Sequence, residues 1–232
     1  MGISFMNRTM IVAHSGCDNT APGSMEGMIA ALNQNVDYIE VDLRLYKGKV
    51  YLSHNLIEGN QLDEYIAFQD VLKLLAPEKV KLNCDLKEQS VFEYALKNLR
   101  EYGMEDRAVF TGEYDNNIDK NNINGNVKYS YFLNVDKKEL CLYHNIIEER
   151  DADKIIDFYR NNRDKAMAAL NIDYRIISPA AKVKFYKSEI QISYWTVDDP
   201  NDIEHLLQNN VFSITTNNIA YAVLARERIL GA

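Results

Sequence analysis

The chain has 232 residues, of which 47% are hydrophobic and 26% are charged, and this composition is typical of a globular protein. No apolar run approaches the roughly 20 residues that span a bilayer, so we expect no integral membrane segment. The formal net charge of -8 argues against a nucleic-acid partner, because nucleic acids are bound through clusters of lysine and arginine that the sequence lacks. A chain of this length predicts a single domain over residues 1–232.

Cysteine usage indicates a reducing compartment. Cys17, Cys84 and Cys141 form an odd set, and the first residues do not resemble a signal peptide. We therefore expect a cytoplasmic protein. Cys84 alternates with Asp85, which predicts that its thiol is buried toward a layer of helices. The sequence predicts no particular oligomeric state.

Apolar strand candidates alternate with helical stretches in chain order. Strands are expected at Thr9–Ala13, Tyr38–Leu43, Val50–His54, Val80–Asp85, Ala108–Thr111, Val127–Leu133, Tyr174–Ile177, Ile190–Val197 and Phe212–Thr216. Helices are expected at Met25–Asn33, Phe68–Leu75, Ser90–Tyr102, Asp151–Leu170, Pro200–Gln208 and Ile219–Leu230, with Ser90 and Asp151 as N-caps. The polar run Tyr114–Asn126 is expected to be an exposed loop. This alternation, with short connections, predicts an α/β fold with a parallel sheet.

The expected strand Tyr38–Leu43 carries two carboxylates on one face. Residues alternate along a strand, so Glu40 and Asp42 project side by side. A three-residue loop over residues 46–48, with its glycine in the left-handed conformation, would return the chain so that His54 lies opposite Glu40. A loop one residue shorter would turn His54 to the other face.

A third carboxylate, Asp85, ends the expected strand Val80–Asp85. With Glu40 and Asp42 it makes an all-oxygen ligand set, which suits Mg²⁺ or Ca²⁺ better than Zn²⁺ or copper. Carboxylates on a buried strand are costly without a metal or a cationic partner. The pattern therefore predicts a divalent-metal site, and a metal site flanked by two histidines is typical of enzymes that cleave phosphodiesters.

Six short motifs follow one another along the chain. They are His14-Ser15-Gly16, Glu40-x-Asp42, His54-Asn55, Asp85-x-Lys87, Tyr194-Trp195-Thr196-Val197 and Ile214-Thr215-Thr216-Asn217. Each is weak alone, but in this order they resemble the glycerophosphodiester phosphodiesterase family over nearly the whole chain. The resemblance implies a TIM-type (β/α)8 barrel, and such a barrel has about 250 residues. Nine strand candidates fit eight barrel strands if one arm of the hairpin is an extension.

Several positions depart from the family pattern. Ser15 stands where the family has an arginine that clamps the phosphate, and Pro22 stands where a loop glutamate is usual. Asn55 and Asn217 each replace an aspartate, and Asp85 replaces a glutamate. Both histidines and all three ligand positions still match, which implies metal-dependent phosphodiester chemistry but leaves specificity for glycerophosphodiesters open.

A second resemblance is to the sphingomyelinase D or phospholipase D toxins. They share the barrel, lack the same arginine and loop acid, and carry steps similar to Asp85-Leu86-Lys87, Tyr194–Asp198 and Thr216-Asn217. Those toxins are secreted and disulfide-bonded, which does not match the cysteine usage of this chain. Their lyase-like reaction, which forms a cyclic phosphate, stays open as a chemical alternative, whereas we reject the role of a secreted toxin.

The resemblance implies roles for the two histidines. His14 and His54 would form the acid and base pair, because imidazole titrates near neutrality and both takes and returns a proton. The sequence does not assign which of them deprotonates the nucleophile. His144 and His205 are expected to be surface or packing residues.

Three further residues have two interpretations each. Lys87 would contact the substrate phosphate, or it would form a structural salt bridge to Asp85 or Glu40. Trp195 would be a wall of the substrate pocket or part of the core. Arg44 would replace the missing arginine, although a solvated hairpin charge is the simpler interpretation.

We therefore expect a metal-dependent enzyme that hydrolyses glycerophosphodiesters or related small phosphodiesters. One alternative is a catalytically weakened barrel that binds a phosphodiester without turnover, which the departures at Ser15 and Pro22 favour. Another is an isomerase or aldolase that uses Lys87 to form a Schiff base. That alternative leaves both histidines and the Glu40-x-Asp42 step unexplained.

Overall fold

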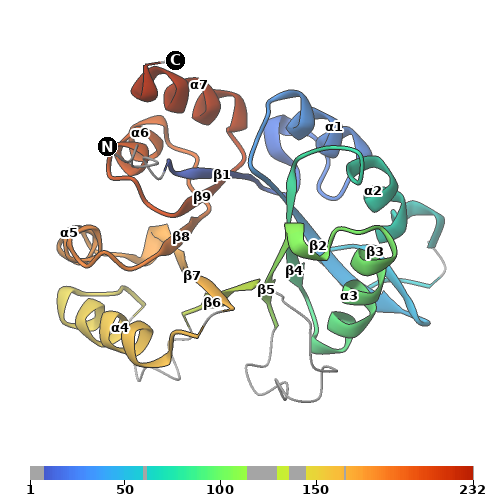
Figure 1. Cartoon of the computed structure of the whole chain (residues 1–232), viewed down its shortest axis with the longest axis horizontal. Helices are drawn as coiled ribbons and strands as arrows, with labels where there is room; N and C mark the ends of the chain where they lie inside the picture. The colour runs from blue at the N-terminus through green and yellow to red at the C-terminus, as the bar shows by residue number, and fades with distance from the viewer. Residues whose placement is uncertain (1–7, 60–61, 114–129, 136–144, 165, 232) are drawn as a thin grey trace, which may run out of the picture.

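Eight parallel strands close into a ring in the computed structural model, which describes residues 8–59, 62–113, 130–135, 145–164 and 166–231 (Figure 1). The pairing of β1 with both β2 and β9 closes the ring. In ring order the strands are β1 (Met10–Ala13), β2 (Tyr38–Tyr46), β4 (Lys81–Leu86), β5 (Ala108–Gly112), β6 (Ser130–Asn134), β7 (Met167–Asp173), β8 (Ile192–Trp195) and β9 (Ser213–Thr216). The predicted TIM-type (β/α)8 barrel is confirmed.

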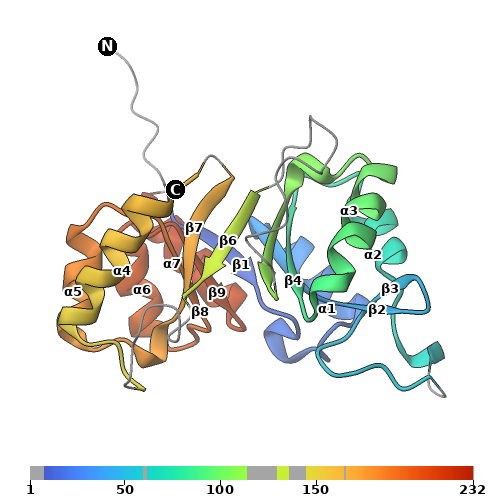
Figure 2. The same ribbon diagram turned by 90° about the horizontal axis from the view of Figure 1, so that it is seen from below.

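The helices lie outside the ring of strands (Figures 1 and 2). They are α1 (Met25–Asn33), α2 (Phe68–Leu75), α3 (Phe92–Glu101), α4 (Glu149–Asn162), α5 (Pro179–Lys187), α6 (Pro200–Gln208) and α7 (Ile219–Leu230). The bounds of α1, α2, α6 and α7 agree with the sequence prediction. None of the helices in the described ranges has the length and apolar character that crossing a bilayer requires.

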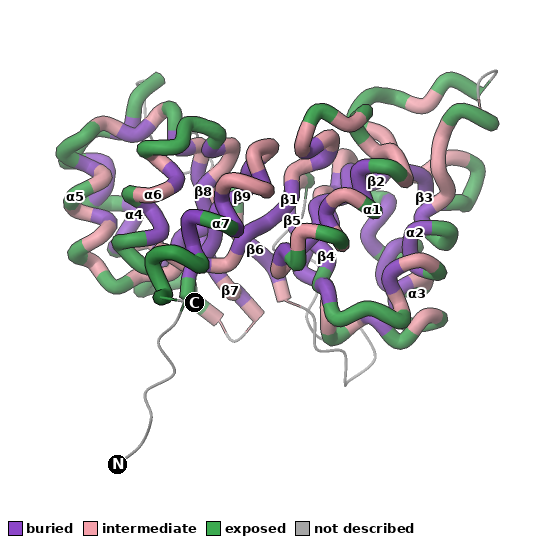
Figure 3. The backbone as a smooth tube through the Cα atoms, turned by 90° about the horizontal axis from the view of Figure 1, so that it is seen from above, coloured by how far each residue is buried: buried purple, intermediate pink, exposed green. Residues whose placement is uncertain are grey.

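Alternation along the strands separates two apolar layers. Outward-facing residues such as Ile39, Val41 and Leu43 pack with the helices in the main core, while Val12 and Phe132 belong to a small cluster inside the barrel. Figure 3 shows buried positions running along the strands and exposed ones on the outer turns of the helices. Polar residues on the inner face of β2 and β4 therefore point into the barrel axis, toward the end where parallel strands finish.

The hairpin after β2 adds a ninth strand outside the ring. β3 (Lys49–Leu52) pairs antiparallel with β2, as the prediction of an extension requires. The turn has two residues, Lys47 and Gly48, with φ of 47° and 77°, because a turn with two left-handed residues matches the twist of the flanking strands. The predicted three-residue loop is wrong, and so is the predicted pairing of His54 with Glu40, because Leu52 pairs with Leu43 and β3 ends there.

The segment after α4 also differs from the prediction. The helix ends at Asn162, and the stretch Met167–Asp173, most of it predicted as helix, forms β7. The predicted strand Tyr174–Ile177 is a 3-10 turn followed by α5, a helix that the sequence analysis missed. Alanine and leucine in Met167–Leu170 favour helix locally, but pairing with β6 and β8 overrides this propensity.

Both predicted N-caps are wrong. The cap of α4 is Glu148, whose side chain and that of Asp151 form a reciprocal capping box. Helix α3 starts only after a 3-10 turn that includes Ser90. The predicted loop Tyr114–Asn126, residues 127–129 of the predicted sixth strand, Cys141 and His144 lie outside the described residues.

Candidate functional site

A cavity of about 420 Å³ opens at the carboxyl ends of the barrel strands. Its lining includes every site residue that the sequence singled out, namely His14, Glu40, Asp42, His54, Asp85, Lys87 and Trp195. These residues come from five different strands or from the loops that follow them. The carboxyl ends of the strands carry the active site in barrel enzymes, because eight loops converge there on a rigid scaffold.

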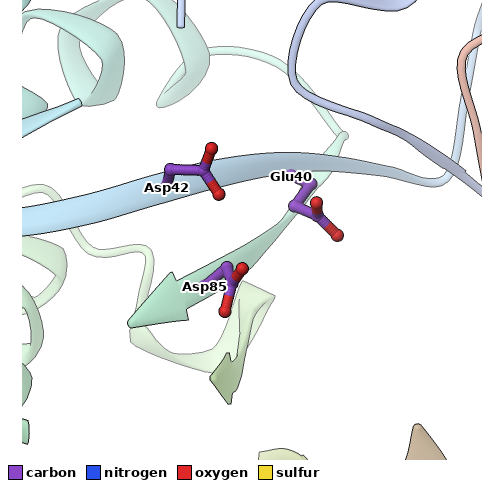
Figure 4. Close-up of side chains that lie close together, drawn as sticks. All are labelled: Glu40, Asp42 and Asp85. Atoms are coloured by element: carbon purple, nitrogen blue, oxygen red, sulfur yellow. The ribbon is translucent and has the colours of Figure 1, made fainter. Parts of the chain in front are cut away.

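Three carboxylates form one cluster at this end. Glu40 and Asp42 lie on β2, and Asp85 lies on β4 directly beside Asp42 in the strand register (Figure 4). Each offers an oxygen atom, and these three atoms lie within 4.8 Å of one another. Glu40 and Asp42 are buried, whereas Asp85 is partly exposed to the cavity.

Burial and mutual repulsion disfavour the charged form of the cluster, and Lys87 offsets this only in part. Burial raises the pKa of Glu40 well above its ordinary value, and the charges of Asp85 and Asp42 raise it further. Burial likewise raises the pKa of Asp85. A cluster of carboxylates whose pKa values are raised in this way fits a hard divalent cation, which would relieve both the desolvation and the mutual repulsion.

Lys87 is the cation that already faces the cluster. Its Nζ lies 2.6 Å from Oδ2 of Asp85 and 2.9 Å from Oδ1 of Asp42. Burial alone lowers the pKa of Lys87, but the charges of Asp85 and Asp42 outweigh this and raise it. The predicted salt bridge to Asp85 is therefore present, and the one considered to Glu40 is replaced by a bridge to Asp42.

Neighbouring strands hold the carboxylates in place. Asn83, which the sequence analysis missed, donates from Nδ2 to Oε2 of Glu40 at 2.8 Å, and Oδ1 of Asn83 accepts from Thr111 at 3.1 Å. Gly112 has φ of 86°, and a side chain there would collide with the Asp85 carboxylate. Asn83 alternates with Asp85 on one strand face, so the same periodicity that found the carboxylates indicates it as well.

His14 is oriented by a chain of hydrogen bonds from the end of β9. Its Nδ1 lies 2.9 Å from Oδ1 of Asn217, and its Nε2 lies 3.8 Å from Oε1 of Glu40. Asn217 donates from Nδ2 to Oδ2 of Asp198 at 2.8 Å and from its backbone N–H to Oδ1 of Asp198 at 2.7 Å. With the Asn217 oxygen facing the ring, Nδ1 of His14 carries the proton and Nε2 faces the carboxylates.

His54 reaches the cavity in a different way from the prediction. It lies beyond the end of β3 and is exposed, and the Nδ1 atom of its ring lies 3.5 Å from Oδ1 of the adjacent Asn55. Arg44 donates to the carbonyl oxygen of His54 from Nε at 3.2 Å and from Nη2 at 3.0 Å. Arg44 also reaches the carbonyl of Lys87 at 3.5 Å and the carboxylate of Glu88 at 3.6 Å. The interpretation of Arg44 as a solvated hairpin charge is therefore wrong.

The rest of the cavity lining includes Glu113, an aromatic side chain and two amides. Trp195, half-buried at the end of β8, lines it, and the adjacent Tyr194 is the fully buried one of the two. The lining also includes Asn134, the last residue of β6, and its register partner Asn171, which lies two residues before the end of β7. Trp195 thus borders the cavity, as its interpretation as a pocket wall requires.

The two departures in the first loop lie outside this cavity. Ser15 is buried, and its Oγ accepts a hydrogen bond of 2.9 Å from the backbone N–H of Gly23. Pro22 is exposed on the same loop. Ser15 therefore forms a hydrogen bond within its own loop and does not line the cavity.

A larger cavity of about 920 Å³ lies at the opposite end of the barrel, among residues such as Tyr38, Lys81 and Phe212 at the starts of strands. It contains none of the clustered acids and histidines, and the amino-terminal end of a barrel normally serves stability. We therefore place the functional site at the smaller cavity. His205, expected at the surface, is exposed on α6 and packs against Tyr186.

No family model and no curated protein sequence matches the chain. Solved structures do match. A glycerophosphodiester phosphodiesterase from Parabacteroides distasonis shares 15% identity at a TM-score of 0.68, covering 96% of this chain and 98% of that one. One from Agrobacterium tumefaciens shares 17% identity at a TM-score of 0.61, covering 94% and 99%.

A phosphodiesterase from Oleispira antarctica, solved with its product sn-glycerol-3-phosphate, is similar at 13% identity and a TM-score of 0.66, covering 96% of this chain and 97% of that one. At identities this low the likeness establishes the fold. The chain therefore has the barrel of the glycerophosphodiester phosphodiesterase structures over nearly its whole length.

Proposed function

We propose that the protein is a metal-dependent phosphodiesterase that hydrolyses glycerophosphodiesters or related small phosphodiesters. One observation carries the proposal: the three clustered carboxylates line the same cavity as His14, His54 and Lys87. Solved barrels of the same shape that are named glycerophosphodiester phosphodiesterases support it. A similar fold does not establish function, so the proposal rests on the residues of the cavity.

Glu40, Asp42 and Asp85 would hold the metal, and Mg²⁺ or Ca²⁺ is the ion that their hard oxygen atoms suit. Such an ion, when bound, supplies Lewis-acid stabilisation of the charge on the phosphate oxygens. Lys87 complements it. An ammonium group has three donors, and two of those on Lys87 reach Asp85 and Asp42, which leaves one for a phosphate oxygen.

His14 is the better oriented of the two proton-transfer groups. Because Oδ1 of Asn217 accepts a hydrogen bond from the Nδ1–H of His14, Nε2 keeps its lone pair on the side of the carboxylates and is free to take a proton. Asp198 fixes the amide of Asn217 and so fixes the tautomer of the ring.

His54 is the second proton-transfer group. One imidazole takes the proton of the attacking hydroxyl as the new oxygen–phosphorus bond forms, and the other, protonated, gives its proton to the leaving alkoxide. Where the substrate has a hydroxyl next to the phosphate, attack by that hydroxyl forms a cyclic phosphate, which water then opens. If the cyclic product leaves before water attacks, the reaction is the lyase-like alternative.

A barrel that binds a phosphodiester without turnover is the second candidate. The hydrogen bond between Ser15 and Gly23 favours this candidate. Ser15 is occupied within its own loop, and the first loop has no arginine at this position to bind the phosphate. The retained pair of histidines beside three carboxylates favours the enzyme.

The experiment that separates the candidates is turnover with Mg²⁺, Ca²⁺ or Mn²⁺. The substrates are glycerophosphocholine, a lysophospholipid and bis-p-nitrophenyl phosphate. We expect metal-dependent cleavage of at least the small diesters, which a chelator abolishes. Tight binding of the diesters without cleavage, under every metal, would favour the binding protein instead.

We also propose a reducing compartment such as the cytoplasm. Cys17 and Cys84 support it, since both are free and buried, and burial raises the pKa of Cys17 to about 11, which keeps the thiol protonated.

A further inference from the structure

The cavity of about 920 Å³ at the amino-terminal end of the barrel has the size of a ligand site. Small-molecule sites have volumes of about 300–1,000 Å³. Residues at or next to the first positions of β1, β2, β4 and β9 line this amino-terminal cavity, so rigid strands hold its walls. Among the described residues, none lines both this cavity and the one that contains the carboxylates. The two cavities are therefore separate.

Two aromatic rings line one wall of the amino-terminal cavity. They belong to Tyr38 and Phe212, and both pack edge-on against Phe132, whose ring centroid lies 6.3 Å from that of Tyr38 and 5.7 Å from that of Phe212. The apolar side chains of Met10 and Val211 extend this wall. Because the edge-to-face contacts fix the rings, the wall offers a preformed surface for a flat apolar group.

The hydroxyl of Tyr38 is a donor that the described part of the protein does not use. The side chain is 5% exposed and lines the cavity, and its oxygen makes no hydrogen bond to another described residue. Burial raises the pKa of Tyr38 to about 12, and the charge of Asp37 contributes, so the hydroxyl keeps its proton at neutral pH. It is therefore able to donate to an oxygen atom of a ligand.

One of the two acids that line the cavity is already neutralised. Arg8 donates from Nη2 to Oδ1 of Asp37 at 2.6 Å, and the buried Arg226 donates to Oδ2 of Asp37. The backbone N–H of Ile11 also donates to Oδ2 of Asp37, at 2.9 Å. Two guanidinium groups share one carboxylate, so this group of side chains has an excess positive charge, although the protein as a whole has a net charge of -8.

Two lysines at or just before the start of β4 add to this charge. Lys79 and Lys81 line the cavity, are exposed and form no ion pair with another described residue. Nζ of Lys81 lies 5.4 Å from the centroid of the Tyr38 ring, which places the ammonium group next to the aromatic wall. The second acid of the lining, Glu78, is exposed and offsets only one of the two lysine charges. An anionic group is therefore attracted to this end of the barrel.

We propose that the amino-terminal cavity is a second ligand site, which binds a small molecule that joins a flat aromatic ring to a phosphate or carboxylate group. The ring of the ligand lies against Tyr38 and Phe212. Its anionic group lies at Lys81, and the Tyr38 hydroxyl is a further donor to it. Nucleoside monophosphates and aromatic carboxylates both have this chemistry. The site does not depend on the proposed function, because the two cavities have no described lining residue in common.

The test compares the binding of charged and neutral aromatic probes by calorimetry. AMP and indole-3-acetate carry a ring and an anionic group, whereas adenosine and tryptophol carry the ring alone. A chelator is present, because without a metal ion the carboxylates of the other cavity repel anions. We expect at least one of the two anions to bind about tenfold or more tightly than its neutral counterpart, since hydrogen bonds to charged groups are the strong ones. The pair with the larger ratio identifies the class as nucleotide or carboxylate.

Two variants separate the two parts of the site. Lys81→Gln should lower the ratio between anion and neutral counterpart by about threefold or more, because it removes the cation next to the aromatic wall. Phe212→Ala should instead weaken the anion and its neutral counterpart alike, by about fivefold or more. Lys49→Gln is the matched control for Lys81→Gln. Lys49 is exposed at the start of β3 and lines neither cavity, so its replacement should leave all affinities at the wild-type values.

Failure of both aromatic anions to bind at millimolar concentration would overturn the site, and so would neutral probes that bind as tightly as the anions. Binding that neither Lys81→Gln nor Phe212→Ala weakens would also overturn it, because the probe would then lie elsewhere. Turnover of bis-p-nitrophenyl phosphate tests the proposed function separately, and Lys81→Gln should leave this turnover unchanged. If no metal supports cleavage of any diester but binding depends on Lys81, the proposed function fails and the second site stands.

Discussion

Oδ1 of Asn217 lies 2.9 Å from Nδ1 of His14, although 203 positions separate the two residues in the chain. The contact joins the loop after β1 to the loop after β9, the two strands whose pairing closes the barrel. Closure of the barrel therefore also builds the most precisely oriented proton-transfer group in the cavity.

Replacing Asn217 by alanine should release His14 without removing it. Nδ1 then loses its acceptor and the ring samples both tautomers, so kcat should fall by about 10–100-fold with little change in KM. A change in the shape of the pH–rate profile should accompany the loss. Asn209→Ala, which removes an exposed amide from the end of α6, is the control. Wild-type kcat in the Asn217 variant would show that His14 needs no such support.

Arg44 should act on catalysis through His54. Arg44→Leu removes both hydrogen bonds to the His54 carbonyl and the contact with the Lys87 carbonyl, so kcat should fall by about tenfold or more. Arg44→Lys, which keeps the charge but replaces the planar guanidinium by a single ammonium group, should recover part of the loss. The control is Arg100→Leu, an exposed arginine on α3. Equal activity of the Leu and wild-type forms at position 44 would remove Arg44 from the account.

The carboxylate cluster should make the metal-free protein less stable as the pH rises. Because the pKa values of Glu40 and Asp85 are raised in the folded state, the folded protein binds more protons than the unfolded chain. The stability this gives is present below the ordinary values of 4.5 and 3.8 and is lost as the pH rises through the raised ones. The raised pKa of Lys87 acts only near pH 10 and above, so it does not alter this trend.

Glu40→Gln removes the charge of the more deeply buried of these two carboxylates, while the side-chain oxygen of the new glutamine would still accept from Asn83. In a chelator at pH 8 this variant should melt at a higher temperature than the wild-type protein, and the difference should shrink toward pH 4. A lower melting temperature for Glu40→Gln at pH 8 contradicts the strain that we assign to the cluster.

Divalent cations should reverse that strain. Saturating Mg²⁺ or Ca²⁺ should raise the melting temperature of the wild-type protein, because an ion held only by the folded state stabilises it by mass action, about 2.7 kcal/mol at a concentration one hundred times Kd. Asp42→Asn combined with Asp85→Asn should abolish the increase. Asp70→Asn, which changes an exposed acid on α2, should keep it. An unchanged wild-type melting temperature with all tested ions counts against the metal site.

The strands and the carboxylates were predictable from sequence because they follow local periodicity. Glu40, Asp42 and Asp85 are on alternating positions of buried strands, and the structure places them on one inner face. Helices α1, α2, α6 and α7 were predictable for the same reason. The strand β7 was not, because its alanine-rich sequence favours a helix and only its pairing with β6 and β8 makes it a strand.

The supports of the site depend on contacts between distant segments. Neither the hydrogen bond from His14 to Asn217 nor that from Arg44 to the His54 carbonyl follows from spacing, since both depend on how loops meet at the carboxyl end of the barrel. The predicted register of the hairpin was wrong by one residue, because the turn consists of two residues, Lys47 and Gly48, and not of three. His54 nevertheless borders the cavity, because it lies past the paired part of its strand.

The most direct measurement of the central claim is phosphorus NMR of glycerophosphocholine incubated with the protein and Mg²⁺ or Ca²⁺. We expect the diester signal to be replaced by a phosphate monoester, with or without a transient cyclic phosphate. In His14→Ala the rate should fall by about two to four orders of magnitude while the metal still raises the melting temperature. A diester signal that persists unchanged with every metal, or a His14→Ala variant that is as active as the wild-type protein, would contradict the assignment of this cavity as a phosphodiesterase site.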